Sequence, residues 1–465
     1  MKVALLNLPD EENFLKESRC QQRASAYQSV FFPITLAYMA ALLRKNRDEV
    51  SIIDAVGQKM SLEQVIEELK KFQPDFVVIS VTTPTIISDV KIIKRMKKEI
   101  ASKYVIFGIH ATYFARELIK IPEIDIVVKG EPEITVSELT KKQLSQINGI
   151  VYKEKGKIRE TPDVNFLDLD KLPFPAWNMI NLEPYRVPIT NKKYVLVATG
   201  RGCPFQCTFC VAPYYYGHKP RMRGIDRVIE EIRFAKKLGI SDFFFFEETF
   251  TVDREWVMRF CEKIIKEKLN IKWFCNTRVN TFDYELAKRM KDAGCWLISF
   301  GIESASEEIL KNVRKNISPE QSMKAVGFGK KAGLLTLGHF IFGLPGETNE
   351  TIEKTIKFAK KLPLDFAEFY IATPYPGSQL FEDYKKTIKN MEWNKFHVAK
   401  QVVRKDLSLE YYLHRALKQF YLRPSVIVNM LRIFGIRKVG TLFLTGIMFV
   451  KTHIFYGKDK KCSKT

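Results

Sequence analysis

The feature that most constrains the fold is a regular alternation of short apolar segments with segments of helical spacing. In residues 1–150 the apolar segments are rich in β-branched side chains, as strands buried in a parallel sheet require. The predicted strands are residues 3–8, 50–54, 76–81, 104–108 and 124–128, and the predicted helices are 33–45, 61–72, 88–98 and 114–119. Such alternation predicts an α/β domain with a doubly wound, Rossmann-like sheet over residues 1–150.

The same alternation returns six times in residues 194–400. The predicted strands are residues 194–199, 242–246, 271–276, 296–301, 336–342 and 366–373. Between them the apolar residues recur with the spacing of amphipathic helices, as in Val228, Ile232 and Ala235. Six consecutive units predict a partial (β/α)6 barrel with its functional residues at the C-terminal ends of the strands.

Two further segments lie outside these domains. Residues 151–193 are predicted to be a linker docked on the surface, because the prolines in residues 172–176 disfavour both helix and central strand. Residues 401–465 form a basic region in which aromatic residues and an apolar stretch, residues 442–450, interrupt the lysines and arginines. This pattern is typical of a mainly helical, amphipathic region that lies in a membrane interface.

The overall charge is strongly positive, with 75 Lys and Arg against 53 Asp and Glu and a net charge of +22. Such a field favours anionic partners, either nucleic acid or an anionic membrane surface. No apolar run reaches the roughly 18–20 residues that a spanning helix needs, and the first residues do not resemble a signal peptide. We therefore expect a cytoplasmic protein, with peripheral contact at the inner membrane surface.

The cysteines predict a metal site. Eight cysteines in 465 residues are too few for a disulfide scaffold, and three of them, Cys203, Cys207 and Cys210, directly follow the first barrel strand. Thiolates suit iron–sulfur clusters, and three of them leave one iron of a cubane open, with Phe209 as an aromatic shield. A structural zinc site normally has a fourth ligand, for which only His218 is near. A zinc site and three unrelated buried cysteines remain the alternatives.

The segment from Gly200 to Cys210, with an aromatic residue before the third cysteine, resembles the signature of the radical S-adenosylmethionine (SAM) superfamily. The resemblance covers residues 194–380, where segments 301–304, 338–348 and 372–378 are similar to the ends of the family's fourth, fifth and sixth strands. It implies a [4Fe–4S] cluster on the three cysteines and SAM on the open iron. The SAM contacts that it implies are Glu303 at the ribose, Gly343 and Pro345 beside the adenine, and Thr373 in the sixth-strand turn.

Residues 246–250 resemble the end of the family's second strand, which implies that Glu247 and Glu248 approach the SAM amino group. Arg278, past the third strand, is a candidate for the SAM carboxylate, since a guanidinium grips a carboxylate with two hydrogen bonds. A loop salt bridge is the alternative for each of these three residues.

A doubly wound domain ahead of such a barrel resembles the cobalamin-binding subclass of the superfamily, as do segments 108–112, 128–133 and 172–176. The D-x-H-x-x-G motif of cobalamin domains is absent, so His110 is not the cobalt ligand, although many members of the subclass lack that motif. The candidate cofactor-binding residues of this domain are Thr82, Thr83, Thr85, Gly108, His110, Gly130 and Glu131. The alternative is an empty α/β domain that docks substrate or supports the barrel.

The resemblance implies reductive cleavage of SAM to a 5′-deoxyadenosyl radical, which abstracts hydrogen from an unactivated carbon. The expected outcome is methylation with cobalamin, or else cyclisation or rearrangement, with ferredoxin or flavodoxin as the electron donor. The basic, aromatic tail suggests a lipid or isoprenoid substrate. A tRNA methylthiotransferase is a second hypothesis, but that family has a cysteine triplet in its N-terminal domain, where this chain has only Cys20. A metal-binding membrane adaptor is a third.

Overall fold

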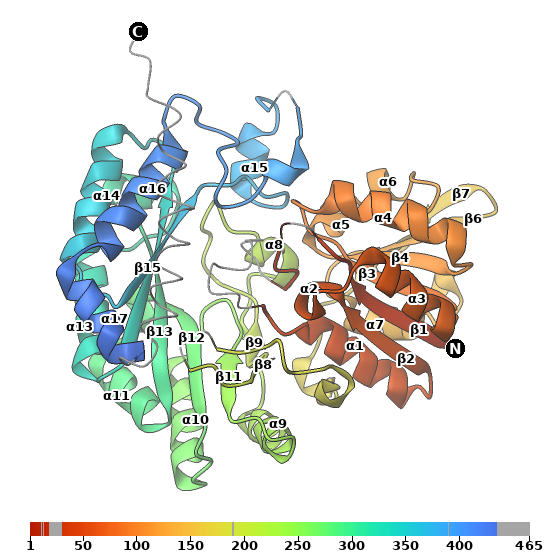
Figure 1. The fold of residues 1–465 in the computed structure, drawn as a ribbon, viewed down its shortest axis with the longest axis horizontal. Coiled ribbons are helices and arrows are strands. Elements are labelled where there is room, and N and C mark those ends of the chain that lie inside the picture. The colour runs from red at the N-terminus through yellow and green to blue at the C-terminus, as the bar shows by residue number, and fades with distance from the viewer. Residues whose placement is uncertain (11, 13, 18–29, 188–189, 389, 435–465) are drawn as a thin grey trace.

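The computed structural model describes residues 1–10, 12, 14–17, 30–187, 190–388 and 390–434. These residues form two β-sheets with their helices, which lie side by side in Figure 1. The segment of residues 18–29, which contains Cys20, lies outside the described residues.

The N-terminal sheet is a doubly wound α/β sheet, as predicted. Its strand order is β2-β1-β3-β4-β5-β6-β7, and the first five strands are parallel. The bounds of these strands are β1 (Lys2–Asn7), β2 (Glu49–Asp54), β3 (Phe76–Ser80), β4 (Lys103–Phe107) and β5 (Ile126–Val128). Strands β6 (Ile150–Glu154) and β7 (Lys157–Glu160) add an antiparallel hairpin to β5. The sheet therefore continues beyond residue 150, where the sequence predicted that a linker begins.

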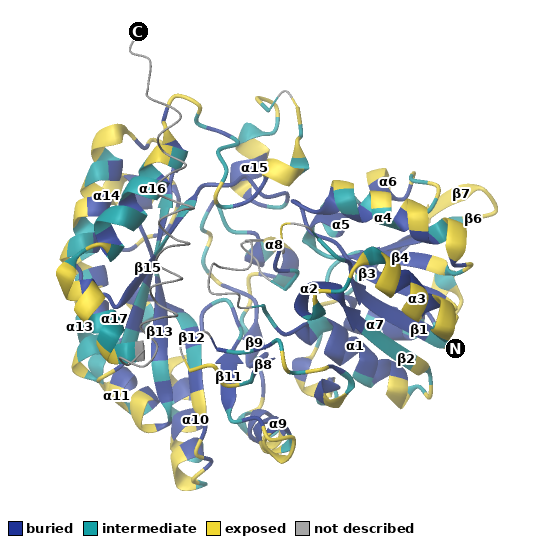
Figure 2. Cartoon of the chain, in the orientation of Figure 1, coloured by how far each residue is buried: buried dark blue, intermediate teal, exposed yellow. Residues whose placement is uncertain are grey.

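Helices cover both faces of this sheet, because alternate residues of its buried strands point to opposite sides. Val77 and Ile79 of β3 pack with α3 and α4, whereas Val78 packs with α1 and α7. The helices of this half are α1 (Ile34–Lys45), α2 (Ala55–Gln58), α3 (Leu62–Phe72), α4 (Ile86–Glu99), α5 (Ile109–Tyr113), α6 (Ala115–Leu118) and α7 (Pro132–Glu138). Figure 2 shows that the strands between these helices are buried.

The segment from residue 161 to residue 193 is packed between the two halves. Trp177, in a 3-10 turn (Trp177–Met179), is fully buried and stacks on Phe234 with ring centroids 5.9 Å apart. Tyr185 is also fully buried, and its hydroxyl donates a hydrogen bond to Asp54 at the end of β2. This segment therefore joins the two halves through buried contacts.

The second sheet forms the predicted partial barrel. Its strand order is β15-β14-β13-β12-β11-β8, and all neighbours are parallel. The bounds are β8 (Tyr194–Val197), β11 (Asp242–Phe245), β12 (Lys272–Arg278), β13 (Cys295–Glu303), β14 (Leu335–Phe342) and β15 (Phe366–Ile371). Within the described residues β15 does not pair with β8, so the sheet does not close into a complete barrel.

The barrel helices begin at side-chain caps, because the first backbone N–H groups of a helix have no partner inside it. Asp253, Asp283, Ser318 and Thr348 accept hydrogen bonds from N–H groups of the helices that they precede. The helices on the outer face are α9 (Ile225–Lys237), α10 (Arg254–Lys266), α11 (Tyr284–Asp292), α12 (Glu307–Asn312), α13 (Pro319–Lys331) and α14 (Asn349–Lys361). Two short helices, α8 (Ala212–Tyr216) and α15 (Gln379–Tyr384), and the hairpin β9 (Gly200–Arg201) and β10 (Arg221–Met222) follow strand ends.

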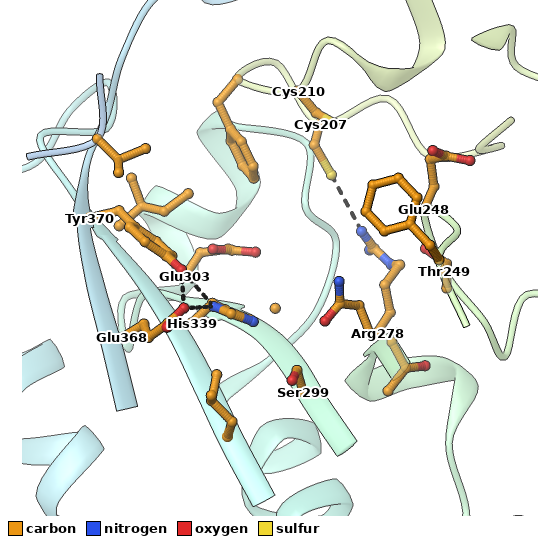
Figure 3. A pocket seen from close by; sticks show the side chains of 18 of the residues that line it. Cys207, Cys210, Glu248, Thr249, Arg278, Ser299, Glu303, His339, Glu368 and Tyr370 are labelled. Atoms are coloured by element: carbon orange, nitrogen blue, oxygen red, sulfur yellow. Dashed lines mark hydrogen bonds and ion pairs between the residues drawn. The ribbon is translucent and has the colours of Figure 1, made fainter. Parts of the chain in front are cut away.

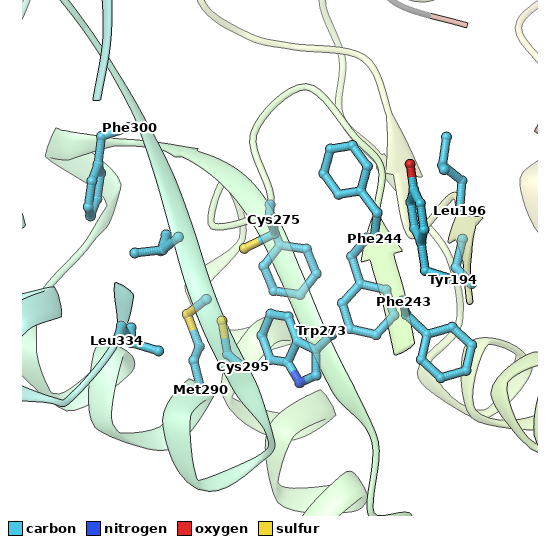
Figure 4. Close-up of a cluster of buried hydrophobic side chains, with 14 of the residues drawn as sticks. Tyr194, Leu196, Phe243, Phe244, Trp273, Cys275, Met290, Cys295, Phe300 and Leu334 are labelled. Atoms are coloured by element: carbon cyan, nitrogen blue, oxygen red, sulfur yellow. The ribbon is translucent and has the colours of Figure 1, made fainter. Parts of the chain in front are cut away.

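Aromatic residues fill both sides of the barrel strands (Figure 4). Phe243 and Trp273 are fully buried beneath the helices, with Cys275 and Cys295 in the same core. Phe244, on the opposite side of β11, stacks on Phe274 at 4.6 Å and faces the barrel interior. The interior of the barrel therefore has an aromatic wall.

The C-terminal helix α16 (Leu409–Tyr421) covers β15 and α14. Leu413 and Phe420 are buried on its inner face, and the Tyr421 hydroxyl donates to the carbonyl oxygen of Ala367 at 2.9 Å. Phe420 and Tyr421 thus pack against the barrel, whereas Tyr411 is exposed, and the membrane contact expected of this region stays a prediction. Helix α17 (Pro424–Phe434) follows, and the apolar stretch 442–450 lies outside the described residues. No described helix is long and apolar enough to cross a membrane.

Candidate active site

The three cysteines line a cavity at the C-terminal ends of the barrel strands. The loop after β9 carries Cys203, Cys207 and Cys210 to the mouth of a cavity of about 440 Å³, a volume typical of small-molecule sites (Figure 3). Gly202 makes the turn possible, because its φ of +94° is left-handed and a Cβ there would meet the carbonyl oxygen of Lys219. The structure thus brings the predicted triplet to one rim of one cavity.

Each of the three thiols has a different neighbour. The Cys203 Sγ atom lies 4.0 Å from Thr249 Oγ1, the Arg278 Nη1 atom donates to Cys207 Sγ at 3.3 Å, and the backbone N–H of Ala212 donates to Cys210 Sγ at 3.4 Å. All three cysteines are free of disulfides. Among the residues that the structure describes, no three His, Cys, Asp or Glu side chains converge where one metal ion would bind them.

The two acidic residues after β11 have different positions. Glu248 lines the cavity, and its carboxylate accepts a hydrogen bond from the backbone N–H of Gly202 at 2.8 Å. Glu247 is 4% exposed and accepts a hydrogen bond from the Thr199 hydroxyl at 2.7 Å, away from the cavity wall. Of this predicted pair, only Glu248 therefore lies where a ligand of the cavity would contact it.

Arg278 lies beside the cluster loop and lines the cavity. Its guanidinium lies 3.7 Å from the ring centroid of Phe205, and its Nε atom donates to Asn280 Oδ1 at 3.2 Å. No carboxylate in the described part of the chain forms an ion pair with Arg278, so the salt bridge considered from the sequence does not form there. The guanidinium is held in place by neutral groups beside a thiol, which suits it to bind an anionic ligand.

Glu303, the last residue of β13, also lines the cavity and is paired with a lysine that the sequence did not suggest. Its Oε1 atom lies 2.6 Å from Lys315 Nζ, and both side chains are less than a tenth exposed. The φ of Glu303 is +66°, a conformation that non-glycine residues rarely adopt and that is concentrated at functional sites. Lys315 follows twelve positions later along the chain, so no local motif could have linked the two residues.

The loop after β14 supports the cavity from behind. Thr373 lines the cavity, whereas Gly343 and Pro345 do not. The φ of Gly343 is +85°, and its N–H donates to the buried carboxylate of Glu347, whose pKa is raised to about 8 by burial. The two residues expected beside the adenine thus do not line the cavity, whereas Thr373 of the sixth-strand turn does.

A polar cluster on β14 and β15, defined here as His339, Glu368 and Tyr370, also faces the cavity and was assigned no role from the sequence. The Nδ1 atom of His339 lies 3.1 Å from the Tyr370 hydroxyl and 3.2 Å from Glu368 Oε2. Residues i and i+2 of a strand point to the same face, so Glu368 and Tyr370 share one side of β15. The i, i+2 spacing of Glu368 and Tyr370 was visible in the sequence, but it indicates a site only once the cavity that they face is known.

The strand ends of the N-terminal sheet face a small cavity of about 50 Å³ between the two halves. Thr82 and Gly108 line it, but Thr85 is buried and hydrogen-bonded to Asp89, with Lys16 donating to the Thr85 hydroxyl at 2.8 Å. Gly130 has open space where a Cβ would be. Thr82 and Gly108 therefore lie on a cavity between the two halves, whose volume is small beside that of a corrinoid.

Two other candidates of this edge are engaged within the protein. His110 is 2% exposed and lies 3.3 Å from the Thr83 hydroxyl and 5.0 Å, between ring centroids, from Trp393; burial lowers its pKa to about 3. Glu131 is paired with Arg201 at 3.0 Å and with Arg221 at 2.8 Å. His110 and Glu131 therefore connect the N-terminal sheet to the second half of the chain.

The comparisons with known proteins agree with this architecture. Residues 197–359 match the family model described as the radical SAM superfamily, and residues 24–140 match the B12 binding domain. An uncharacterised methyltransferase of Pyrococcus horikoshii is 38% identical over 85% of this chain and 89% of its own. The anaerobic magnesium-protoporphyrin IX monomethyl ester cyclase of Rubrivivax gelatinosus is 31% identical over 80% of this chain and 70% of its own.

A solved structure has the same fold. The radical S-adenosylmethionine methyltransferase TsrM of Kitasatospora setae, with cobalamin and a [4Fe–4S] cluster bound, superposes with a TM-score of 0.67. The alignment covers 83% of this chain and 75% of that one, at 18% identity. The likeness therefore concerns the arrangement of a B12 binding domain and a partial barrel in one chain.

Proposed function

The chain belongs to the radical SAM superfamily, among its members with a B12 binding domain, and from this premise we propose that it methylates or cyclises an unactivated carbon of a hydrophobic substrate. The observation that carries the proposal is the position of the three cysteines, which share the rim of one cavity with Arg278 and Glu303. The cofactors are a [4Fe–4S] cluster, SAM and cobalamin.

In this proposal different residues of the rim bind different groups of the cofactors. Cys203, Cys207 and Cys210 hold the cluster, which together with SAM supplies a 5′-deoxyadenosyl radical when both are bound. Arg278 binds the SAM carboxylate, Glu303 its ribose and Glu248 its amino group. Phe209, which also lines the cavity, shields the cluster from water.

The wall of the cavity supports a hydrophobic substrate. Phe244, Phe246, Phe274 and Phe366 line the barrel interior and exclude water from it. Exclusion of water and of competing C–H bonds is necessary where a reactive radical forms. The relatives named above include a methyltransferase and a cyclase of a macrocycle, which supports both reaction types. The electron donor, ferredoxin or flavodoxin, and contact with a membrane surface remain predictions.

The experiment compares wild type with Cys207→Ala and with a matched control, Cys261→Ala, which removes a buried cysteine from α10. Each chain is reconstituted anaerobically with iron and sulfide, then incubated with SAM and a reductant, and 5′-deoxyadenosine is measured by mass spectrometry. Wild type and Cys261→Ala should form the product, whereas Cys207→Ala should form none and bind less iron. Equal turnover in Cys207→Ala would contradict the cluster assignment.

The B12 binding domain is tested separately by the corrinoid that the protein retains. Reconstituted protein is mixed with hydroxocobalamin, passed through a desalting column and examined for corrinoid absorbance. Because the cavity between the halves is only about 50 Å³, we expect corrinoid uptake to be slow in wild type. Uptake should be faster in Arg201→Met, in which an ion pair between the halves is removed. Absence of retention in both proteins would contradict a cobalamin-dependent reaction.

A further inference from the structure

The polar cluster on β14 and β15 is isolated in an otherwise apolar part of the cavity. His339 and Glu368 are paired directly across the two parallel strands, and the Tyr370 hydroxyl donates to Glu368. The residues on the same wall one step below, Leu337 and Phe366, are apolar. A polar group set in an apolar wall fixes the orientation of a ligand, because it offers the only hydrogen bond on that side.

The geometry determines which way the histidine faces. Nδ1 lies beside two acceptors, the Tyr370 hydroxyl oxygen and the Glu368 carboxylate, so the ring proton resides on Nδ1 in the neutral imidazole. The Nε2 atom is then a hydrogen-bond acceptor, and no described residue forms a hydrogen bond to it. In Figure 3 the ring of His339 reaches into the cavity from these strands, across from Arg278.

The cluster remains accessible to a ligand, and its only charged group is the carboxylate of Glu368. The side chains of His339 and Glu368 are 24% and 38% exposed although both lie inside the barrel, so they are exposed to the cavity itself. Burial alone would raise the pKa of Glu368, but its hydrogen bonds to His339 and Tyr370 lower it. A carboxylate so placed repels an anionic ligand group.

We propose that the polar cluster is a binding subsite for a neutral hydrogen-bond donor, a hydroxyl or N–H group, carried by the hydrophobic substrate. This inference rests on the proposed function, because it treats the cavity as the place where the substrate is bound. His339 Nε2 accepts a hydrogen bond from the donor group of the substrate. Glu368 and Tyr370 hold the imidazole ring in the orientation that this requires. The aromatic wall of Phe244 and Phe274 contacts the remainder of the substrate.

The test uses three small aromatic probes that differ in one group: 2-naphthol donates a hydrogen bond, 2-methoxynaphthalene only accepts one, and 2-naphthoate is an anion. Binding to the cluster-reconstituted full chain is measured by equilibrium dialysis at pH 8, where an ordinary imidazole is neutral. Wild type should bind 2-naphthol about fivefold more tightly than 2-methoxynaphthalene, the preference expected from one net hydrogen bond. With SAM added to occupy Arg278, the cationic residue of the same cavity, it should bind 2-naphthoate more weakly than either.

The variants locate this preference at the cluster. His339→Leu should abolish it, His339→Gln should retain part of it because an amide oxygen also accepts, and Tyr370→Phe should reduce it by releasing the ring. The matched control, His414→Leu, removes a histidine of α16 outside the cavity and should leave the preference unchanged. Equal binding of 2-naphthol and 2-methoxynaphthalene by wild type, or a preference that persists in His339→Leu, would overturn the inference.

The two proposals fail separately. The same preparations are assayed for 5′-deoxyadenosine, which requires the cluster and SAM but not the donor group of a substrate. A wild-type chain that forms 5′-deoxyadenosine but shows no preference for the donor overturns this inference alone. A chain that shows the preference but forms no 5′-deoxyadenosine overturns the proposed function alone.

Discussion

Replacing Arg201 by methionine removes a buried charge that joins the two halves of the molecule. Arg201 is 8% exposed at its side chain and pairs with Glu131 at 3.0 Å and with Glu133 at 2.5 Å. In this variant Glu131 retains its ion pair with Arg221 at 2.8 Å. The destabilisation therefore comes from Glu133, whose side chain is 0% exposed and loses its partner. Breaking a buried pair on one side costs about 3–5 kcal/mol, because the remaining charge is left buried and unpaired.

The free energy of unfolding is measured by anaerobic urea titration followed by circular dichroism, and proteolysis between residues 161 and 193 reports undocking. R201M should lose about 3–5 kcal/mol, and R201M/E133L, which removes both partners, should recover most of this loss. The control is R254M, because Arg254 also bridges two carboxylates, Asp283 and Glu285, but on the exposed surface. That control should lose at most about 1 kcal/mol, and an equally small loss in R201M would refute the reasoning.

Three further predictions concern stability. Gly294→Ala should lower the melting temperature, because φ is +95° and the new Cβ would meet the carbonyl oxygen of Ile271, whereas Gly327→Ala in α13 has open space and should gain up to about 1 kcal/mol. The pKa of His110 is lowered to about 3 in the folded chain, so between about pH 6.5 and pH 3 the unfolded chain binds a proton that the folded chain does not bind. Stability is therefore lost as the pH falls through this range. The urea midpoints at pH 7 and pH 5 should differ less in His110→Gln than in wild type. The pKa of Glu347 is raised from 4.5 to about 8, so stability is lost as the pH rises between these values, and Glu347→Gln should flatten that slope. A pH profile identical to that of wild type in either variant would contradict the corresponding prediction.

The order of elements was readable from the sequence because each strand is a compact apolar run. All five parallel strands of the first sheet and all six of the barrel lie within a few residues of their predicted positions. The hairpin β6–β7 was assigned to the linker, although two short β segments on either side of a turn at residues 155–157 are readable from the sequence. Three of residues 157–160 are charged and all four are exposed, as in a surface segment. Only the pairing of β6 with β5, which lies in three dimensions, identifies it as part of the sheet.

The candidate site was predictable where chemistry is concentrated in a short motif and not where it depends on distant partners. The cysteine spacing identified one rim of the cavity, since three thiolates within eight positions have few other uses. Lys315 and Glu368 carry no such signal, because each becomes meaningful only beside Glu303 or His339. Thr85 is a further example: its hydrogen bond from Lys16, which lies 69 positions earlier, could not be read from the sequence.

The unclosed edge of the barrel makes the two halves inseparable. Phe31, which precedes the first helix, lies 5.7 Å from Phe244 between ring centroids, and the Tyr194 hydroxyl of β8 donates to the carbonyl oxygen of Val30 at 3.0 Å. A fragment cut before residue 194 would retain every cysteine of the triplet yet present an uncovered strand edge and bare aromatic rings, which is the surface through which sheets aggregate. We therefore expect the barrel half without residues 1–193 to be less soluble than the full chain.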